Sequence, residues 1–312
     1  MKNFEAMKAQ TIGVEVEMNN LSRRDAIKAV ADTFGTAWSI THVSDGYDSW
    51  VCRDGASRTW KICRDSSIRG PESQKCELVT PILNYGDMAT LQAVIRNLRK
   101  AGAKSDPTRG CGVHIHIGAA GHTAQTLRNL ANIMASHENL LIDALKIDSD
   151  RIRSYCRTVN PHFLEKLNKE KPSTWEKLAD LWYTENRATF DRNAHYNDSR
   201  YHMLNLHATF TKGTIEFRLF QFDAPADGKQ NGLHAGQLKA YIQLCLALSQ
   251  AAKDAKSASP KQPQVENPKY AMRTWLLRLG FIGEEFATAR DILTRNLAGD
   301  AAFRHGRPSA VA

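Results

Sequence analysis

Two short β-branched segments carry acids and histidines at a spacing that suits a cation. One segment reads GVEVE and a later one reads GVHIHI. Because successive side chains of a strand point to opposite faces, Glu15 and Glu17 share one face of the first strand. By the same alternation, His114 and His116 share one face of the second. Two carboxylates on one face repel each other unless water, protons or a cation lies between them. The spacing therefore predicts a metal or phosphate site on the open face of a sheet.

Two further segments repeat this pattern with residues that bind cations and phosphate. In TIEFRLF, Glu216 and Arg218 share one face, and in CELVTP, Glu77 is the only acid of an apolar strand. Mg²⁺ takes carboxylate oxygens, and a guanidinium offers a planar fork to phosphate or carboxylate. If these strands form one sheet, their polar side chains converge on one concave surface.

A β-hairpin is predicted over residues 201–222. The segment MLNLHATF alternates polar and apolar residues, so that Asn205, His207 and Thr209 share a face. The turn TKG follows, and TIEFRLF returns as the second strand. In WKICRDSSI the same reasoning places Asp65 on one strand face with Ser67.

The remaining elements mix strands and helices without regular βαβ alternation. That order favours an α+β fold with a largely antiparallel sheet. The segments DGYDSW and RGPESQ are typical of turns. The expected strands are about 11–18, 37–43, 57–63 and 75–80, and the expected helices are about 23–34, 88–100, 232–254 and a long one that Thr123 opens.

Composition sets the class of protein. The chain has 312 residues, of which 42% are hydrophobic, and no apolar run approaches the roughly 20 residues of a membrane helix. Its start has no apolar stretch of the signal-peptide type, so we expect a soluble, cytoplasmic protein. The six cysteines form no CxxC pair and are expected to be reduced thiols.

The net charge of +9 suits an anionic partner, such as a nucleotide, a nucleic acid or an acidic peptide. The basic residues are scattered and form no single basic tract. The sequence contains no GxxxxGK[ST], no HExxH and no GxSxG motif. If the protein binds a nucleotide, we therefore expect a binding motif other than a P-loop.

Taken in order, five motifs resemble the amidoligases of the glutamine synthetase and glutamate–cysteine ligase superfamily. They are GVEVE, WKICRDSSI, CELVTPIL, GCGVHIHI and RYHMLNLHATFTKGTIEFRLF. The resemblance implies a glutamine synthetase-like catalytic domain, with a curved, largely antiparallel sheet as a partial barrel and helices packed outside. It places that domain at 1–254, with a helical insertion around 120–200. A polar linker at 255–268 and a C-terminal helical extension at 269–312 would follow.

The resemblance also implies the reaction. A carboxylate would attack the γ-phosphate of ATP to give an acyl phosphate, and an amine would then displace phosphate to form an amide or isopeptide bond. ATP and Mg²⁺, for which Mn²⁺ could substitute, would be the cofactors. The partners would be an amino acid, peptide or protein carboxylate and an amine acceptor. Neither a membrane nor a nucleic acid is expected as a partner, and the oligomeric state stays open.

Individual roles follow from the same resemblance. Arg218 would stabilise the transferring phosphoryl group or the acyl phosphate, and Asp65 would help to accept a proton from the amine. Asp45 and Asp48 in DGYDSW are alternatives to Asp65 for the family aspartate. The remaining assignments are the metal ligands Glu15, Glu17, Glu77 and Glu216, and the nucleotide- or substrate-binding residues His114, His116, Arg200 and Asn205.

Two other functions are weighed against the ligase. A metal-dependent hydrolase could use the same acids and histidines with water as the nucleophile, although no HExxH spacing supports it. A non-catalytic nucleic-acid-binding protein would account for the positive charge and would bind with strong salt dependence. Against that second alternative, an acid-lined concave face is a poor place for a phosphate backbone.

Overall fold

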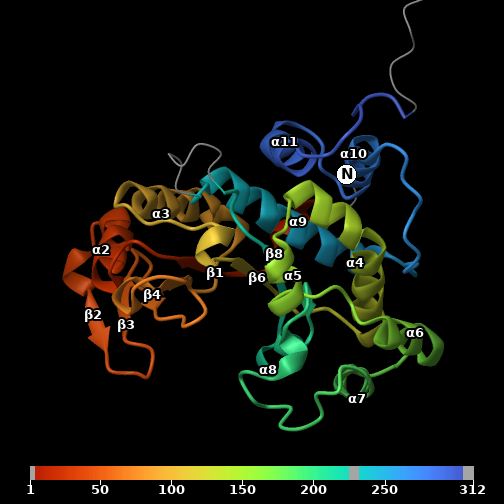
Figure 1. Cartoon of the computed structure of the whole chain (residues 1–312), viewed down its shortest axis with the longest axis horizontal. Helices are drawn as coiled ribbons and strands as arrows, with labels where there is room; N and C mark the ends of the chain where they lie inside the picture. Colours follow the sequence, from red (N-terminus) through yellow and green to blue (C-terminus); the bar gives the residue numbers. More distant parts are fainter. Residues whose placement is uncertain (1–3, 225–231, 305–312) are drawn as a thin grey trace, which may run out of the picture.

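One antiparallel sheet forms the centre of the fold. The computed structural model describes residues 4–224 and 232–304. In this part of the chain the strands pair in the order β2-β3-β4-β5-β1-β6-β8-β7, and the sheet is curved and open, with β2 and β7 as its edges (Figure 1). The strands are β1 (Ile12–Met18), β2 (Thr41–Val43), β3 (Ser49–Arg53), β4 (Thr59–Cys63), β5 (Cys76–Val79), β6 (Val113–Gly118), β7 (Leu204–Asn205) and β8 (Thr214–Phe220).

The central strands bury one apolar face. Val14 and Val16 of β1 and Ile115 and Ile117 of β6 are almost fully buried and belong to the core. Burial of such a side chain stabilises the fold by roughly 1.5–3 kcal/mol. The alternation that buries these residues directs the side chains between them to the opposite, concave face.

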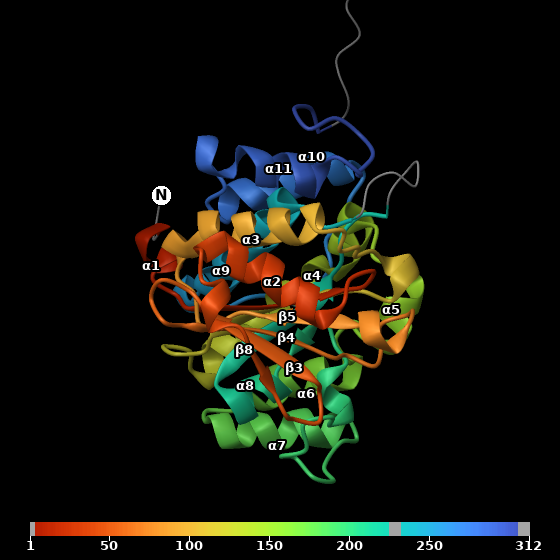
Figure 2. The same cartoon turned by 90° about the vertical axis from the view of Figure 1, so that its left-hand side faces the viewer.

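Helices cover the apolar face in layers. α2 packs on β3 and β4, and α9 packs on β6, with α3 and α4 beside them (Figure 2). None of the helices in the described residues is long and apolar enough to span a membrane. The longer helices are α2 (Arg23–Phe34), α3 (Met88–Lys100), α4 (Ala124–Leu145), α6 (Pro161–Glu170), α7 (Trp175–Glu185), α9 (Ala235–Asp254), α10 (Pro268–Arg278) and α11 (Ala287–Thr294), and the short ones are α1 (Phe4–Lys8), α5 (Ser149–Ser154) and α8 (His207–Lys212).

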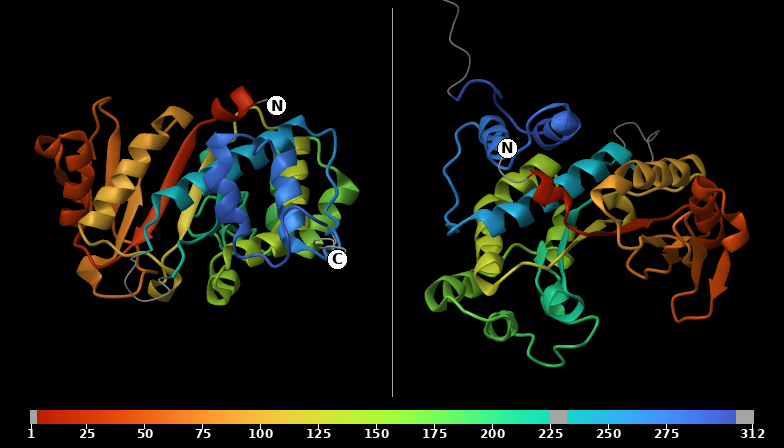
Figure 3. Two further views of the ribbon diagram at one scale, coloured as in Figure 1. Left: turned by 90° about the horizontal axis from the view of Figure 1, so that it is seen from above. Right: turned by 180° about the vertical axis from the view of Figure 1, so that it is seen from behind.

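The C-terminal helices form an outer layer. α11 packs on α9, and α10 packs on α11, so that both lie outside the helices that cover the sheet (Figure 3). Residues 255–267 have no regular secondary structure and connect α9 to α10. The division of the chain at 254 and 268 stays a prediction, and residues 305–312 of the expected extension lie outside the described residues.

Several helix limits were predictable from capping residues. The Ser22 side chain accepts a hydrogen bond from the backbone N–H of Asp25 at the start of α2, and Gly35 ends that helix in the left-handed conformation. The Thr123 side chain caps α4 in the same way, through the N–H of Thr126. The α+β class and the curved, antiparallel sheet with outer helices are likewise confirmed.

The predicted hairpin over 201–222 is wrong in its first half. β7 contains only two residues, and His207 and Thr209 lie in the helix α8 instead of on a strand. The reason is a cap, because Asn205 Oδ1 accepts hydrogen bonds from the N–H groups of His207 and Ala208 and turns the chain into a helix.

The N-terminal half of the sheet also departs from expectation. β3 begins inside DGYDSW, a segment expected to be only a turn. In the expected strand 37–43, residues 37–39 form a 3₁₀ turn and only residues 41–43 form the short β2. β4 ends at Cys63, so Asp65 and Ser67 lie in the following loop and not on a strand face. Asp65 Oδ1 accepts hydrogen bonds from the N–H and the hydroxyl of Ser67, each at 2.7 Å.

Candidate active site

The register of the central strands brings the predicted acids and histidines together. Glu15 of β1 lies directly opposite His114 of β6, and Glu17 lies opposite Glu77 of β5. Side chains at opposite positions have Cβ atoms about 4.5–5.5 Å apart. Hydrogen bonds and ion pairs follow, with His114 Nδ1 at 3.0 Å from Glu15 Oε2 and His114 Nε2 at 3.8 Å from Glu17 Oε1.

The row of side chains continues across β8. His116 lies opposite Glu216, which in turn lies opposite Asn205 of β7. Asn205 Nδ2 donates to Glu216 Oε2 at 2.6 Å, and Arg218 Nη1 donates to Glu216 Oε1 at 2.5 Å. Glu216 is therefore fixed from two sides. The acidic row is the set Glu15, Glu17, Glu77, Glu216, His114 and His116.

The acidic row offers three adjoining positions for a cation. In each group the ligand atoms lie within 4.8 Å of one another. Neighbouring groups share Glu15 or Glu77, so the three positions are next to each other. The groups are Glu15, His116 and Glu216; Glu15, Glu77 and His114; and Glu17, Asp65 and Glu77.

One buried atom of the row lacks the partner that a cation would provide. His116 Nδ1 is hydrogen-bonded to Thr214 Oγ1, but His116 Nε2 is buried and has no hydrogen-bond partner among the described residues. It lies 3.4 Å from Glu15 Oε1 and 4.0 Å from Glu216 Oε1. Carboxylates suit Mg²⁺ or Mn²⁺ and imidazole suits transition-metal ions, so the residues present fit a divalent cation.

The electrostatics of Glu77 point to the same conclusion. Burial raises the pKa of Glu77 well above its usual value, and the negative charges of Glu15, Glu17 and Asp65 raise it further. A buried carboxylate among like charges retains a proton unless a cation neutralises the group. A bound cation would reverse this shift.

Glu15 and Glu216 are instead held ionised. Burial raises the pKa of Glu15, but the nearby imidazoles of His116 and His114 outweigh it and hold the pKa well below its usual value. Burial acts on Glu216 in the same way, and Arg218 and His116 outweigh it, which holds its pKa at about 2. The row therefore combines two acids that are held ionised with one acid, Glu77, whose pKa is raised.

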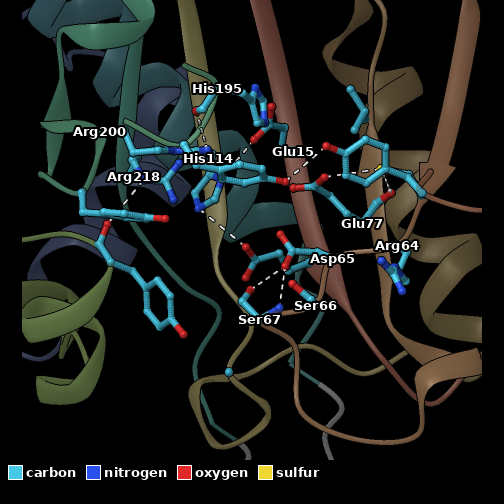
Figure 4. A pocket seen from close by; sticks show the side chains of 18 of the residues that line it. Glu15, Arg64, Asp65, Ser66, Ser67, Glu77, His114, His195, Arg200 and Arg218 are labelled. Atoms are coloured by element: carbon cyan, nitrogen blue, oxygen red, sulfur yellow. Dashed lines mark hydrogen bonds and ion pairs between the residues drawn. The ribbon is translucent and has the colours of Figure 1, made fainter. Parts of the chain in front are cut away.

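Four members of the row line a cavity of about 710 Å³, called the main cavity below, and Glu216 lines a smaller cavity beside it. The four are Glu15, Glu17, Glu77 and His114. The volume of the main cavity lies in the range of roughly 300–1,000 Å³ that is usual for small-molecule sites. Figure 4 shows Arg200 and Arg218 on one side of the acids and Arg64 on the other. Basic and aromatic side chains complete the lining: Lys61, Arg64, Arg151, Arg200, Lys212, Arg218, Tyr47, Tyr155, Tyr196 and Tyr201.

The structure separates the three candidate aspartates. Asp65 lines the main cavity and shares a ligand group with Glu17 and Glu77. Asp48 forms ion pairs with Arg23 and His42. Asp45 Oδ1 accepts hydrogen bonds from the backbone of its own turn. Asp65 is thus the aspartate that the fold brings to the site.

The other predicted residues divide between two cavities. Arg218 is buried and lines the main cavity. The guanidinium of Arg200 lies 5.3 Å from the ring centre of Tyr196 and 5.7 Å from that of Tyr201. Asn205 does not line the main cavity but a smaller one next to it.

A family model described as "putative amidoligase enzyme" matches residues 8–249, which is most of the chain. The chain belongs to this family. The resemblance seen in the five sequence motifs is thereby confirmed. Membership supports an enzyme of the ligase type, one that joins a carboxylate to an amine.

One solved structure resembles this amidoligase in its chain path. It is the crystal structure of a bifunctional glutathione synthetase from Pasteurella multocida, with 13% sequence identity and a TM-score of 0.45. The match covers 93% of this chain and 47% of that one, so the amidoligase spans about half the length of that protein. No curated protein matches the chain.

Sequence reasoning missed a buried cation of the amidoligase site. Arg151 Nη2 donates to the backbone carbonyls of Arg218 and Phe220, and Arg151 Nη1 lies 3.9 Å from Glu17 Oε2. The guanidinium packs on Gly112, where an added Cβ would lie 2.2 Å from Arg151 Nη2. The glycine before the GVHIHI strand signals a close approach, but nothing in the sequence indicates which residue approaches.

Eight further basic or aromatic lining residues were also missed. They are Tyr47, Lys61, Arg64, Tyr155, His195, Tyr196, Tyr201 and Lys212, which reach the main cavity from strands, loops and helix ends. Isolated tyrosines and basic residues carry no motif, so the sequence offers no signal that would have singled them out.

Proposed function

We propose that this amidoligase is an ATP- and Mg²⁺-dependent carboxylate–amine ligase that works through an acyl phosphate. The observation that carries the proposal is the acidic row, with its three adjoining ligand groups beside the buried Arg218. Mg²⁺ is held in proteins by a few carboxylates together with substrate phosphates. Bound Mg²⁺ would supply neutralisation of the phosphate charge.

The proposed chemistry has two steps. A carboxylate oxygen of the first substrate attacks the γ-phosphorus of ATP, and ADP leaves. The amine nitrogen then attacks the acyl carbon, the bond between carbon and the bridging oxygen breaks, and phosphate leaves with the electron pair. Such phosphoryl transfer depends on positioning and electrostatic stabilisation more than on covalent chemistry by the protein.

The side chains of the main cavity take roles in this scheme. Arg218 stabilises the transferring phosphoryl group, and Asp65 helps to accept a proton from the amine. No residue in the described part of the chain pairs with the ammonium groups of Lys61 and Lys212, and these groups suit anionic groups of the nucleotide and the substrate. The acids Glu15, Glu17, Glu77 and Glu216 would hold the cations, and His114, His116, Arg200 and Asn205 would support the nucleotide, the metal or the substrate.

Nucleotide binding tests the proposal. Calorimetric titration with a non-hydrolysable ATP analogue compares the wild type with the double variant Glu15→Gln/Glu17→Gln, each with and without Mg²⁺. We expect binding that needs both Mg²⁺ and the two acids. As a control for the fold, Glu165→Gln changes an exposed acid of α6 outside the cavity and should bind as the wild type does.

Two results would count against the ligase. Equal binding of the ATP analogue with and without Mg²⁺ would show that the acidic row takes no part in nucleotide binding. Absence of binding in the wild type would favour a hydrolase on the same residues. The cytoplasmic location stays a prediction from the sequence. The oligomeric state and the identity of the carboxylate substrate stay open.

A further inference from the structure

A second cavity of about 190 Å³, called the side cavity below, adjoins the main cavity. His195, Arg200 and Lys212 line both cavities and form the boundary between them. Glu216 of the acidic row lies at the wall of the side cavity. The remaining lining residues are Asn193, Asn205, His207, Ala208 and Thr211.

The lining of the side cavity holds both an acid and a base. The carboxylate of Glu216 is buried there, and Asn205 and Arg218 hold it in place. Lys212 is exposed at the end of α8, and no ion pair or hydrogen bond engages its ammonium within residues 4–224 and 232–304. The side cavity therefore pairs a fixed anion with an unpaired cation.

His195 stands at the boundary with a free imidazole. Its backbone carbonyl accepts a hydrogen bond from Arg200 Nη1, while its ring nitrogens have no hydrogen-bond partner in the described part of the chain. Burial lowers the pKa of His195, and the positive charges of Arg200 and Lys212 lower it further. The carboxylates Glu15 and Glu216 act in the opposite direction without reversing the shift. A lowered pKa favours the neutral imidazole, which is the form that can accept a proton.

We propose that the side cavity binds the amine acceptor, that the acceptor is a small zwitterionic amino acid, and that His195 takes a proton from its ammonium group. The ammonium group would face His195 and Glu216, whose carboxylate it would share with a cation of the acidic row, and the carboxylate would face Lys212 and Arg200. This inference rests on the proposed ligase function and adds the class of the second substrate.

The size of the side cavity limits the acceptor. A volume of about 190 Å³ suits a single small amino acid and not a long peptide. Ammonia has no anionic group to pair with Lys212, whereas an amino acid has one charged group for the acid and one for the base of this lining. A zwitterion is therefore the ligand whose charges match those of the lining.

The proton balance is complete with the residues present. His195 Nδ1 or Nε2 takes one proton from the ammonium group, which frees the nitrogen lone pair. The amine attacks the acyl carbon of the acyl phosphate, and phosphate leaves. The second proton of the nitrogen passes through Asp65, the acid that helps to accept a proton in the proposed function, to the departing phosphate, and the imidazolium releases its proton to solvent. A positioned base of this kind contributes typically 10²–10⁴-fold to the rate.

A binding experiment tests the site itself. Saturation-transfer NMR records each of the twenty proteinogenic amino acids against the wild type, Thr211→Phe and Thr184→Phe, with Mg²⁺ and a non-hydrolysable ATP analogue present. Thr211 is an exposed lining residue of α8, so phenylalanine fills the side cavity without entering the core. Thr184 is an exposed residue of α7 that lines neither cavity.

We expect the wild type and Thr184→Phe to bind at least one small amino acid, and Thr211→Phe to lose that binding. Lys212→Met should weaken it at least tenfold. The inference is overturned if the wild type binds none of the twenty, or if Thr211→Phe binds as well as Thr184→Phe.

A kinetic experiment tests His195. Acyl phosphate formed in the wild type is trapped either by the acceptor identified by NMR or by hydroxylamine, which is largely unprotonated at neutral pH and needs no base. In His195→Gln the ratio of acceptor-dependent to hydroxylamine-dependent turnover should fall at least tenfold. An unchanged ratio would show that His195 does not transfer the proton. A merely structural role would lower the acceptor-dependent and the hydroxylamine-dependent turnover by the same factor.

The two experiments separate the failure of this inference from that of the ligase proposal. Hydroxamate formation without amino acid binding leaves the ligase standing and overturns the acceptor site. Amino acid binding without any nucleotide-dependent turnover overturns the acceptor role together with the ligase function.

Discussion

The two sides of the main cavity are built differently. The acidic row comes from four adjacent strands whose register fixes every cross-strand pair. The opposite side, called the loop wall, comes from chain segments outside the strands. The loop wall consists of Tyr47, His195, Tyr196, Arg200, Tyr201 and Lys212.

This difference separates two tasks. Side chains on paired strands are held within narrow limits, as a cation or a transferring phosphoryl group requires. Loops tolerate change in length and sequence, and they carry specificity on top of a rigid scaffold. Under the proposed function, the acidic row would carry the phosphoryl chemistry and the loop wall would set the choice of substrate.

Removal of one charge from the acidic row should have the largest effect. Glu216→Gln keeps the shape of the side chain but leaves the buried cation Arg218 without its partner. We expect ATP-dependent phosphate release to fall at least about 100-fold, as for loss of one electrostatic contact in a transition state.

Circular dichroism should show that Glu216→Gln remains folded. Glu165→Gln, the exposed control on α6, should keep wild-type activity. Full activity in Glu216→Gln would show that the acidic row does not carry the chemistry, contrary to the difference drawn between the two sides of the cavity.

Glu138, a buried acid that does not line the main cavity, tests how burial changes the pKa of a carboxylate outside the acidic row. Glu138 of α4 is buried, its two carboxylate oxygens accept from the N–H of Val159, and burial raises its pKa to about 7. Because the folded-state pKa lies above the unfolded value, its protonated form stabilises the fold at low pH. That contribution is lost as the pH rises through about 7.

Between pH 5 and 8 the wild type should lose about 2–3 kcal/mol of unfolding free energy relative to Glu138→Gln. Urea unfolding at both pH values measures this difference. A difference that does not change with pH would show that Glu138 titrates as an ordinary acid, and that burial alone does not explain the shifts in the acidic row.

The packing of Arg151 on Gly112 connects the two regions. Gly112→Ala places a Cβ against the buried guanidinium, which has to move away from Glu17 and from the carbonyls of β8. We expect a loss of about 2 kcal/mol in unfolding free energy, as for an overpacked core. Gly86→Ala, where no atom lies within 4 Å, is the control, and equal stability of the two variants would contradict the steric argument.

The smallest effect is expected on the loop wall. The hydroxyl groups of Tyr47 and Tyr196 lie 3.3 Å apart, from segments 149 residues apart in the chain. Tyr47→Phe removes this one exposed hydrogen bond, worth about 1 kcal/mol or less. We expect KM for the substrate to rise a few-fold with kcat unchanged. A fall in kcat with unchanged KM would instead place Tyr47 among the residues that act on the transition state.

More residues of the acidic row than of the loop wall could be predicted from the sequence. Glu15, Glu17 and the histidines of GVHIHI stand in strongly alternating segments, where the period of two fixes the face without further information. His207 and Thr209 show the limit of that reasoning, because the cap provided by Asn205 turns an alternating segment into a helix. Asp65 reached the site although its expected strand position was wrong.

The sequence by itself determined the acids and histidines of the site, the strands that carry most of them and the family, because each depends on local period or on a motif. Only the tertiary structure decided which residues meet them. Arg151, His195 and Lys212 lie far along the chain from Glu15 and stand in no pattern. Their approach depends on how the helical segments fold back over the sheet. That folding results from packing between distant surfaces, which no local signal encodes.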